Sequence, residues 1–469
     1  MFCLRIGLID IPSVPFVQPK YFERLNRLKC ELEDVWAETK GASVINYTKK
    51  TFSIGLLTLS TYLKTNIKGI KIDYCNYLDL NKINSNIKKY DYIGITAKSP
   101  FLSIVLNIAK NIKKSNPNIK VVIGGSGPTN DPKTYLKSKF VDFVVLEEGE
   151  ISFLKLLTSK PLSKINGIGY KQKDRIVINK SITYLGNERI PTSDYSLFDD
   201  DLNNYNINIT YMRGCLYNCA FCAKFQGPIR FRKTTDIIAE LKFLNKHLLP
   251  NTPIHFSDNI ICIDVNRFVK LMNAIIKSNL NNLYFVCDLR ANHTTPEIVR
   301  KLDEANFKLI NLGVEDCNDS VLHKNNKQLS YSQMKEAMQI IRDNSNALIG
   351  VYWMIALPGT TNKTINQNLN EIKRLILTKQ VDFILPSLFK PYPGSAISNN
   401  PKKYGIKMVN SWDEWLLNYY LPLWTSNQFN VTDLSNLNKK YLKVIIDTYK
   451  ERCTKKYVKD VSFKNTIGL

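Results

Sequence analysis

Residues 206–222 read NINITYMRGCLYNCAFC, an apolar segment followed by three closely spaced cysteines. The apolar, β-branched part predicts a strand, so Cys215, Cys219 and Cys222 are expected on the loop that leaves it. Three thiolates at this spacing can hold three corners of an iron–sulfur cubane and leave the fourth iron open to another ligand. A closed zinc site needs a fourth cysteine or histidine with matching local spacing, and none stands nearby. The spacing therefore favours an iron–sulfur cluster over zinc, and both over three unrelated thiols.

The strand before the cysteines is the first of six predicted in the second half of the chain. Stretches with helical periodicity separate them, one of which opens with a capping residue, a proline and an acid at 295–297. Six βα units over 204–400 predict a partial (β/α)6 barrel of the TIM type, because a closed eight-unit barrel typically needs about 250 residues. Its reactive face is expected at the carboxyl ends of the strands. The predicted strands are 206–212, 253–258, 283–289, 308–315, 349–359 and 383–389.

Residues 1–160 show a separate alternation of strands and helices. The strands are short, β-branched and almost continuously apolar, which is typical of strands buried on both faces. The alternation predicts an α/β domain with a doubly wound, Rossmann-like parallel sheet, in which ligands bind beyond the carboxyl ends of the strands. The glycine run 124–127 is not GxGxxG, which makes a nicotinamide site a poor interpretation. The predicted strands are 5–10, 70–75, 91–96, 120–125 and 143–148.

The remaining segments have weaker patterns. Residues 161–203 contain one possible hairpin and a polar, proline-bearing stretch, and are predicted to form a linker. Residues 401–469 are predicted to form a helical C-terminal extension, and the aromatic residues of that segment are expected to pack against the barrel. These aromatic residues are Trp412, Trp415, Tyr419, Tyr420 and Trp424.

Composition and charge narrow the functional classes. The chain of 469 residues is 44% hydrophobic and 23% charged, as in a globular protein of two or three domains. Its net charge of +24 is spread evenly, with +11 on residues 1–200 and +13 on the rest, so nucleic acid is not expected as a partner despite the basic excess. No apolar run is long enough to span a bilayer, and the N-terminus lacks the pattern of a signal peptide. A cytoplasmic protein is expected, with its ten cysteines reduced.

The cysteine motif resembles that of the radical S-adenosylmethionine (SAM) enzymes, whose signature CxxxCxxC has an aromatic residue before its third cysteine, here Phe221. The resemblance extends over residues 206–400. Within the family, these residues are similar to the subgroup that carries an N-terminal cobalamin-binding domain. Segments KVVIGGSGPT (120–129) and VDFVVLEEGE (141–150) also resemble that subgroup. The other motifs that carry the resemblance are IHFSDNI around Asp258, CDLRAN around Arg290, NLGVED around Glu315, ALPGTT at 356–361 and PYPGS at 391–395.

The resemblance implies a [4Fe-4S] cluster held by the three cysteines, with SAM bound at the open iron. It implies that SAM cleavage yields a 5'-deoxyadenosyl radical, and that cobalamin, as methylcobalamin, delivers a methyl group to an unactivated carbon of a small-molecule or peptide substrate. A flavodoxin or ferredoxin is the expected electron donor. The alternatives are a radical SAM oxidative cyclisation or rearrangement without methyl transfer, and a nucleic-acid-modifying iron–sulfur protein.

The same resemblance assigns the SAM contacts. Phe221 is expected near the adenine, and Asp258, Arg290 and Glu315 are expected to hold ribose or methionine groups. Each of these three charged residues could instead have a purely structural role, as a cap, a surface ion pair or a solvated loop residue. Ala356 and Thr360 stand where the family often has glycine and glutamate.

Cobalamin contacts are expected at the strand ends of the first domain. No histidine precedes His247, so the first domain cannot supply a histidine to cobalt. The glycine run would let backbone approach the corrin tail, although it would equally serve a tight strand-to-helix turn. Cys287, Cys317 and His255 are expected to be packed residues and not reactive ones. The expected cobalamin contacts are Thr96, Gly124, Gly125, Ser126, Gly127 and Glu148.

Overall fold

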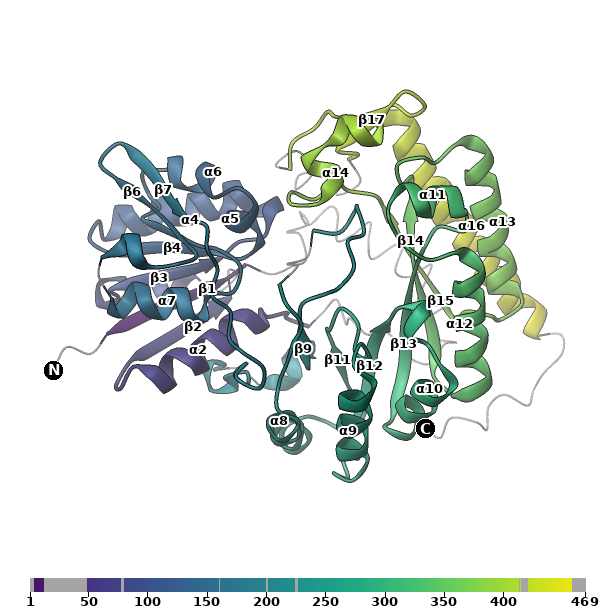
Figure 1. The fold of residues 1–469 in the computed structure, drawn as a ribbon, viewed down its shortest axis with the longest axis horizontal. Coiled ribbons are helices and arrows are strands. Elements are labelled where there is room, and N and C mark those ends of the chain that lie inside the picture. The colour runs from purple at the N-terminus through teal and green to yellow at the C-terminus, as the bar shows by residue number, and fades with distance from the viewer. Residues whose placement is uncertain are drawn as a thin grey trace.

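The computed structural model describes residues 4–11, 49–76, 80–159, 161–199, 201–223, 227–412, 414 and 421–457. The chain forms two sheet-containing units that lie side by side, with the C-terminal elements against the second (Figure 1). Among the described residues, no helix is both long and apolar enough to cross a membrane.

The first unit is built on a seven-stranded sheet in the order β2-β1-β3-β4-β5-β6-β7. Its first five strands are parallel, as predicted, and their bounds are β1 (Arg5–Asp10), β2 (Lys71–Asn76), β3 (Tyr92–Thr96), β4 (Lys120–Gly124) and β5 (Phe143–Val145). The sheet is flanked by α2 (Ile54–Asn66), α3 (Asn81–Asn84), α4 (Leu102–Ser115), α5 (Ser126–Asn130), α6 (Pro132–Lys137) and α7 (Gly149–Thr158).

The hairpin expected inside 161–203 is present as β6 (Ile168–Gln172) and β7 (Arg175–Asn179). It pairs antiparallel with β5 and so extends the first sheet. This part of the predicted linker belongs to the first sheet, because Ile168 and Tyr170 are buried in its core. These side chains are buried because the hairpin lies beside β5. Local composition does not reveal which strand a hairpin will pair with.

The second unit is an open six-stranded parallel sheet in the order β15-β14-β13-β12-β11-β8, which confirms the partial barrel. The strands are β8 (Ile207–Ile209), β11 (Thr252–Phe256), β12 (Leu283–Leu289), β13 (Phe307–Glu315), β14 (Leu348–Ile355) and β15 (Phe383–Leu388). Helices cover the outside of the sheet (Figure 1): α8 (Thr234–His247), α9 (Val265–Ile276), α10 (Pro296–Glu304), α11 (Asp319–Lys324), α12 (Tyr331–Asn344) and α13 (Asn362–Leu377).

Local sequence explains where several of these helices begin. The hydroxyl of Thr295 accepts the N–H of Ile298 at the start of α10, as its cap position predicts. Capping boxes open α12 at Ser330 and α13 at Thr361. Each cap fixes the residue at which its helix begins on the outer layer.

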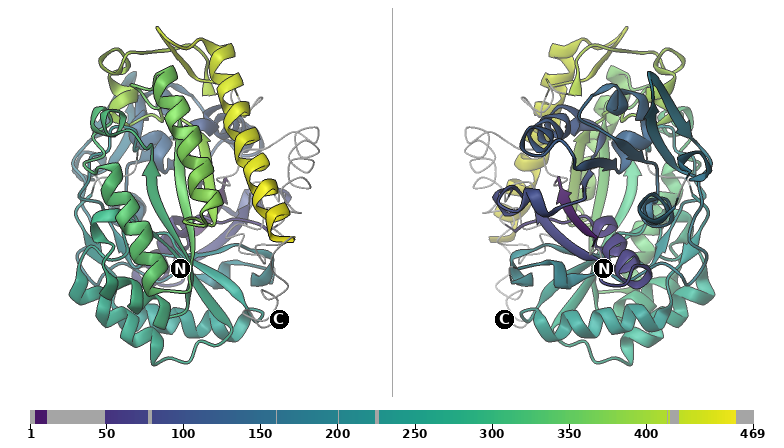
Figure 2. Two further views of the ribbon diagram at one scale, coloured as in Figure 1. Left: turned by 90° about the vertical axis from the view of Figure 1, so that its right-hand side faces the viewer. Right: turned by 90° about the vertical axis from the view of Figure 1, so that its left-hand side faces the viewer.

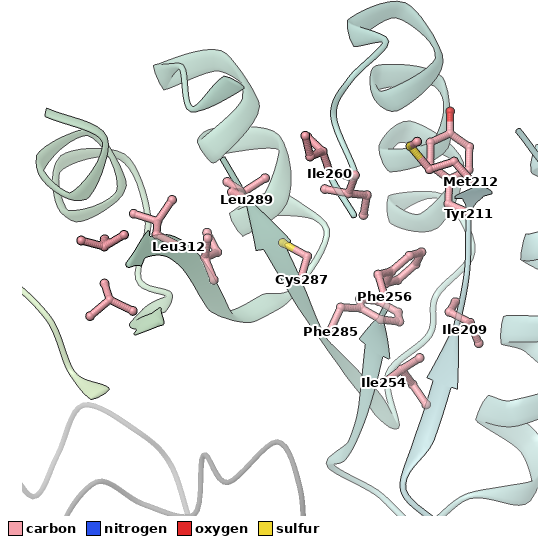
Figure 3. Packing of buried hydrophobic residues seen from close by; sticks show 14 of the residues in the cluster. Ile209, Tyr211, Met212, Ile254, Phe256, Ile260, Phe285, Cys287, Leu289 and Leu312 are labelled. Atoms are coloured by element: carbon pink, nitrogen blue, oxygen red, sulfur yellow. The ribbon is translucent and has the colours of Figure 1, made fainter. Parts of the chain in front are cut away.

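The core of the second unit is a packed apolar layer between sheet and helices. Phe256, Phe285 and Phe307 lie with ring centroids 5.3–5.7 Å apart. Cys287 is fully buried near Phe256 and Phe285 (Figure 3), which confirms its expected packing role. Burial raises the pKa of the Cys287 thiol well above its ordinary value, so the thiol is unreactive.

The C-terminal extension is only partly helical. Helix α16 (Val431–Tyr457) runs along α13 (Figure 2), and its Tyr449 hydroxyl accepts the N–H of Ile384 and donates to the carbonyl of Asp382. Trp424, expected in a helix, instead lies in β17 (Trp424–Ser426), which pairs with β16 (Ile406–Met408). The expectation for Trp424 was wrong. Trp415, Tyr419 and Tyr420 lie outside the described residues.

Lys390 follows β15 and is 9% exposed. Burial lowers the pKa of its ammonium group to about 8 from its ordinary 10.5, because desolvation disfavours the charged form. The folded state therefore binds this proton more weakly than the unfolded state, and stability rises with pH between these two values. We expect Lys390→Met to raise the free energy of unfolding at pH 7 by about 1–3 kcal/mol, measured by denaturant titration. The gain should shrink toward pH 10; a gain independent of pH would contradict the ionisation argument.

Candidate functional site

A cavity of about 870 Å³ lies where the carboxyl ends of both sheets face each other. From the first unit, Thr96 and the 124–126 turn line it. From the second, the three clustered cysteines line it together with the ends of β12 and β13. Predicted cofactor residues from both domains therefore line one cavity.

The cysteines lie on a loop closed at its base by a short antiparallel ribbon, β9 (Met212–Arg213) and β10 (Arg230–Phe231). None of the three cysteines is in a disulfide, all three are half-buried, and the N–H of Cys222 donates to the carbonyl of Cys219 at 3.0 Å. In the described part of the chain, no three histidine, cysteine, aspartate or glutamate side chains are arranged to hold a metal ion. The loop places all three thiols on one wall of the cavity, where a cubane held by three thiolates would keep one iron open to a ligand.

Asp258 lies behind this loop and is 1% exposed. Its carboxylate accepts the N–H of Tyr211 at 2.8 Å and the N–H of Met212 at 2.6 Å. Burial raises its pKa to about 7, against the opposing effect of these backbone bonds. Asp258 does not line the cavity, so the structure places it as a support of the segment that enters the cysteine loop, and its expected contact with SAM stays a prediction.

Arg290 and Glu315 both line the cavity, and both contact Lys327. The Nζ of Lys327 lies 3.0 Å from Oε1 of Glu315 and 5.9 Å from the ring centre of Phe221. The guanidinium of Arg290 donates to the carbonyl of Lys327 and lies 3.8 Å from the ring centre of Tyr217. Its Nη1 also lies 3.7 Å from Sγ of Cys219. The predicted SAM residues other than Asp258 thus surround the cysteine loop.

Two buried polar atoms in this cluster have no hydrogen-bond partner in the structure, Oε2 of Glu315 and Nε of Arg290. Glu315 also adopts φ 70°, next to a register shift at the end of β13. A left-handed glutamate is strained, and strain of this kind is concentrated at ligand sites. The unsatisfied acceptor and donor match a ligand that carries hydroxyl, amino and carboxylate groups.

Family models match both halves of the chain. The model described as "Radical SAM superfamily" matches residues 209–372, and the model described as "B12 binding domain" matches residues 42–157. The chain belongs to the cobalamin-binding radical SAM enzymes. This membership confirms the expected enzyme class and the cofactors [4Fe-4S] cluster, SAM and cobalamin.

Individual relatives of this radical SAM enzyme are distant. It is similar to uncharacterized methyltransferase PH0819 of Pyrococcus horikoshii, with 25% identity over 71% of this chain and 75% of the relative. It is 24% identical to an anaerobic magnesium-protoporphyrin IX monomethyl ester cyclase of Rubrivivax gelatinosus, over 66% of this chain and 58% of that protein. Its fold is similar to that of the radical SAM methyltransferase TsrM of Kitasatospora setae, with a TM-score of 0.65, 15% identity, and 87% of this chain and 79% of that chain covered.

The cobalamin-binding domain of this radical SAM enzyme presents an open edge of backbone to the cavity. A Cβ at Gly124 would meet no atom closer than 4.0 Å, whereas Gly125 has φ 98° and a Cβ there would lie 2.7 Å from the carbonyl oxygen of Ala97. The 124–126 turn, beside Thr96 at the end of β3, is therefore low enough for a large planar group to approach. Gly127 does not line the cavity. A Cβ there would collide with the hydroxyl of Tyr135, so glycine at this position allows close packing.

Sequence reasoning missed a polar wall on the barrel side of the cavity. Asp288 and Tyr352 line the cavity from β12 and β14, and the Tyr352 hydroxyl donates to Asp288 at 3.1 Å. The Nε2 of His255 lies 3.6 Å from the same carboxylate, and Nδ2 of Asn311 donates to it at 3.2 Å. Their common signal is a polar side chain at an inward position of a strand that is otherwise apolar, which would have identified Asp288 and Asn311. Lys327 lies outside the strands and carried no such signal.

Proposed function

We propose that this protein is a cobalamin-dependent radical SAM methyltransferase that acts on an unactivated carbon of a small-molecule or peptide substrate. The observation that carries the proposal is the single cavity lined by both the cobalamin-domain turn and the cysteine loop. A methyl carrier and a radical source that share one cavity can act on the same substrate carbon without release of an intermediate.

In this proposal, Cys215, Cys219 and Cys222 hold the cluster, and Glu315 and Arg290 bind polar groups of SAM through their unpaired atoms. When bound, the cluster and SAM supply a carbon-centred radical, and cobalamin supplies a transferable methyl group. The stacking of Arg290 on Tyr217 fixes the guanidinium beside the cysteine loop. Phe221, 9% exposed, provides an apolar surface for the adenine.

The relatives support methyl transfer more than its alternative. Both PH0819 and TsrM are described as methyltransferases, whereas the Rubrivivax protein is described as a cyclase. Because one relative is described as a cyclase, oxidative ring closure is the second candidate function. The two activities differ in one product, because only methyl transfer converts SAM to S-adenosylhomocysteine.

Anaerobic reconstitution with iron, sulfide, cobalamin, SAM and a candidate substrate tests the proposal. We expect 5'-deoxyadenosine, S-adenosylhomocysteine and a methylated product, measured by liquid chromatography with mass spectrometry. Formation of 5'-deoxyadenosine and a dehydrogenated product without S-adenosylhomocysteine would favour the cyclase alternative and reject methyl transfer.

The proposed chemistry needs an electron donor for the cluster. We place the enzyme in the cytoplasm, where a low-potential flavodoxin or ferredoxin reduces the cluster. Reduction by purified flavodoxin or ferredoxin, followed by the loss of absorption near 400 nm, tests this donor class.

A further inference from the structure

Two arginines stand directly opposite each other at the base of the cysteine loop. In the β9–β10 ribbon, Arg213 is the register partner of Arg230. Like charges directly opposite each other in an antiparallel pair are destabilising unless an anion separates them. The chain between the two strands carries the three cysteines, so this pair lies at the point where that segment begins and ends.

The separating anion comes from the other domain. Oε1 of Glu148 lies 2.5 Å from Nη2 of Arg230, and its Oε2 lies 2.7 Å from Nη1 of Arg230 and 3.0 Å from Nη1 of Arg213. Nη2 of Arg213 donates to Glu150 at 2.8 Å. These side chains are 4–16% exposed, so water screens the charges weakly. The arginines hold the pKa of Glu148 below its ordinary value despite burial.

The segment that carries Glu148 is also linked to Arg230 through Tyr184. The preceding residue, Glu147, has φ 54°, and its carboxylate accepts the hydroxyl of Tyr184. The ring of Tyr184 in turn lies 4.7 Å from the guanidinium carbon of Arg230. The strained turn between β5 and α7 is thus fixed by contacts that converge on the loop base.

We propose that Glu148 is a positioning residue that closes the base of the cysteine loop and holds that loop against the cobalamin-binding domain. Both of its carboxylate oxygens are engaged by arginines, so the charge acts on the protein and not on cobalamin. This role deepens the proposed function, on which it rests, because methyl transfer needs both halves of the cavity in register.

Hydrogen–deuterium exchange of the holoenzyme measures the loop directly. In Glu148→Gln we expect the amides of residues 214–229 to exchange at least about tenfold faster, because two opposed buried cations lose their shared counter-charge. Glu188→Gln is the matched control. Glu188 pairs with Arg267 at 3.1 Å, but these side chains are 49% and 39% exposed, so exchange in that variant should stay at the wild-type rate.

Product ratios give the second readout. In Glu148→Gln we expect the ratio of 5'-deoxyadenosine to methylated product to rise at least about tenfold, since radical formation continues while the two domains lose register. Glu148→Asp keeps the charge on a side chain shorter by one methylene, and we expect it to fold and to restore part of the exchange protection. Wild-type exchange in both Glu148 variants, or equal acceleration in Glu188→Gln, would overturn the proposal.

The exchange readout does not depend on methyl transfer. If the wild-type enzyme forms no methylated product with any substrate, the proposed function fails, whereas faster exchange of 214–229 in Glu148→Gln still supports the positioning role of Glu148. If methylation occurs and exchange is unchanged, the positioning role fails alone.

Discussion

Replacing Cys219 with alanine should abolish the iron–sulfur absorption near 400 nm and the formation of 5'-deoxyadenosine. Three protein thiolates hold three irons of a site-open cubane, and the loss of one leaves two irons without a protein ligand. Even the loss of an outer hydrogen-bond partner of a metal ligand typically costs about 10–100-fold in affinity or activity, so removal of a ligand should exceed about 100-fold. Iron and sulfide analysis, electron paramagnetic resonance of the reduced protein and product assays measure the effect.

The matched control is Cys317→Ser. Cys317 is a half-buried thiol after β13 that does not line the cavity, and burial raises its pKa to about 12. Its replacement should leave cluster content and product formation near wild type. A Cys219→Ala protein that still binds four irons per chain and cleaves SAM would contradict the ligand assignment. RNA that co-purifies with this variant and dissociates with salt would revive the nucleic-acid alternative.

The strands of both sheets could be predicted because parallel strands buried on both faces are almost continuously apolar. All six predicted barrel strands are present, and their ends bring Arg290 and Glu315 to the cavity that the cysteines line, although Asp258 lies outside it. Trp424 could not be placed this way. Its indole N–H donates to the carbonyl of Phe389, 35 residues earlier, and that contact holds it in a strand. A tertiary bond of this kind leaves no periodic signal.

The residues of the candidate site likewise differ in how far the sequence predicts them. The cysteine cluster follows from local spacing. Phe221, Arg290 and Glu315 follow from the family resemblance, and the barrel explains why Arg290 and Glu315 stand at strand ends. The role of Glu148 does not, since its partner Arg230 is 82 residues away and belongs to another domain. The sequence motif places Glu148 at the strand end, but only the folded chain shows which group its charge faces.

Replacing Gly214 with alanine should empty the cluster site without touching a cysteine. Gly214 has φ 95°, and a Cβ there would lie 2.6 Å from the carbonyl oxygen of Gly227 and 2.5 Å from that of Pro228. These are backbone atoms of the returning leg of the loop, so no side chain can move aside. A left-handed alanine costs about 1–2 kcal/mol and an overpacked contact about 1–3 kcal/mol. Together these costs should lower cluster occupancy at least about tenfold, measured as iron and sulfide per chain.

Gly69→Ala separates the two costs. Gly69 also has a positive φ, 77°, but a Cβ there would meet no atom within 4 Å. This variant should therefore lose only the conformational contribution, about 1 kcal/mol of unfolding free energy, and keep its full cluster content. Circular dichroism melts and iron content of the two variants test the difference. If Gly214→Ala binds the cluster as well as Gly69→Ala does, the two legs of the cysteine loop can separate without cost, and the closed ribbon base is not what holds the three thiols in place.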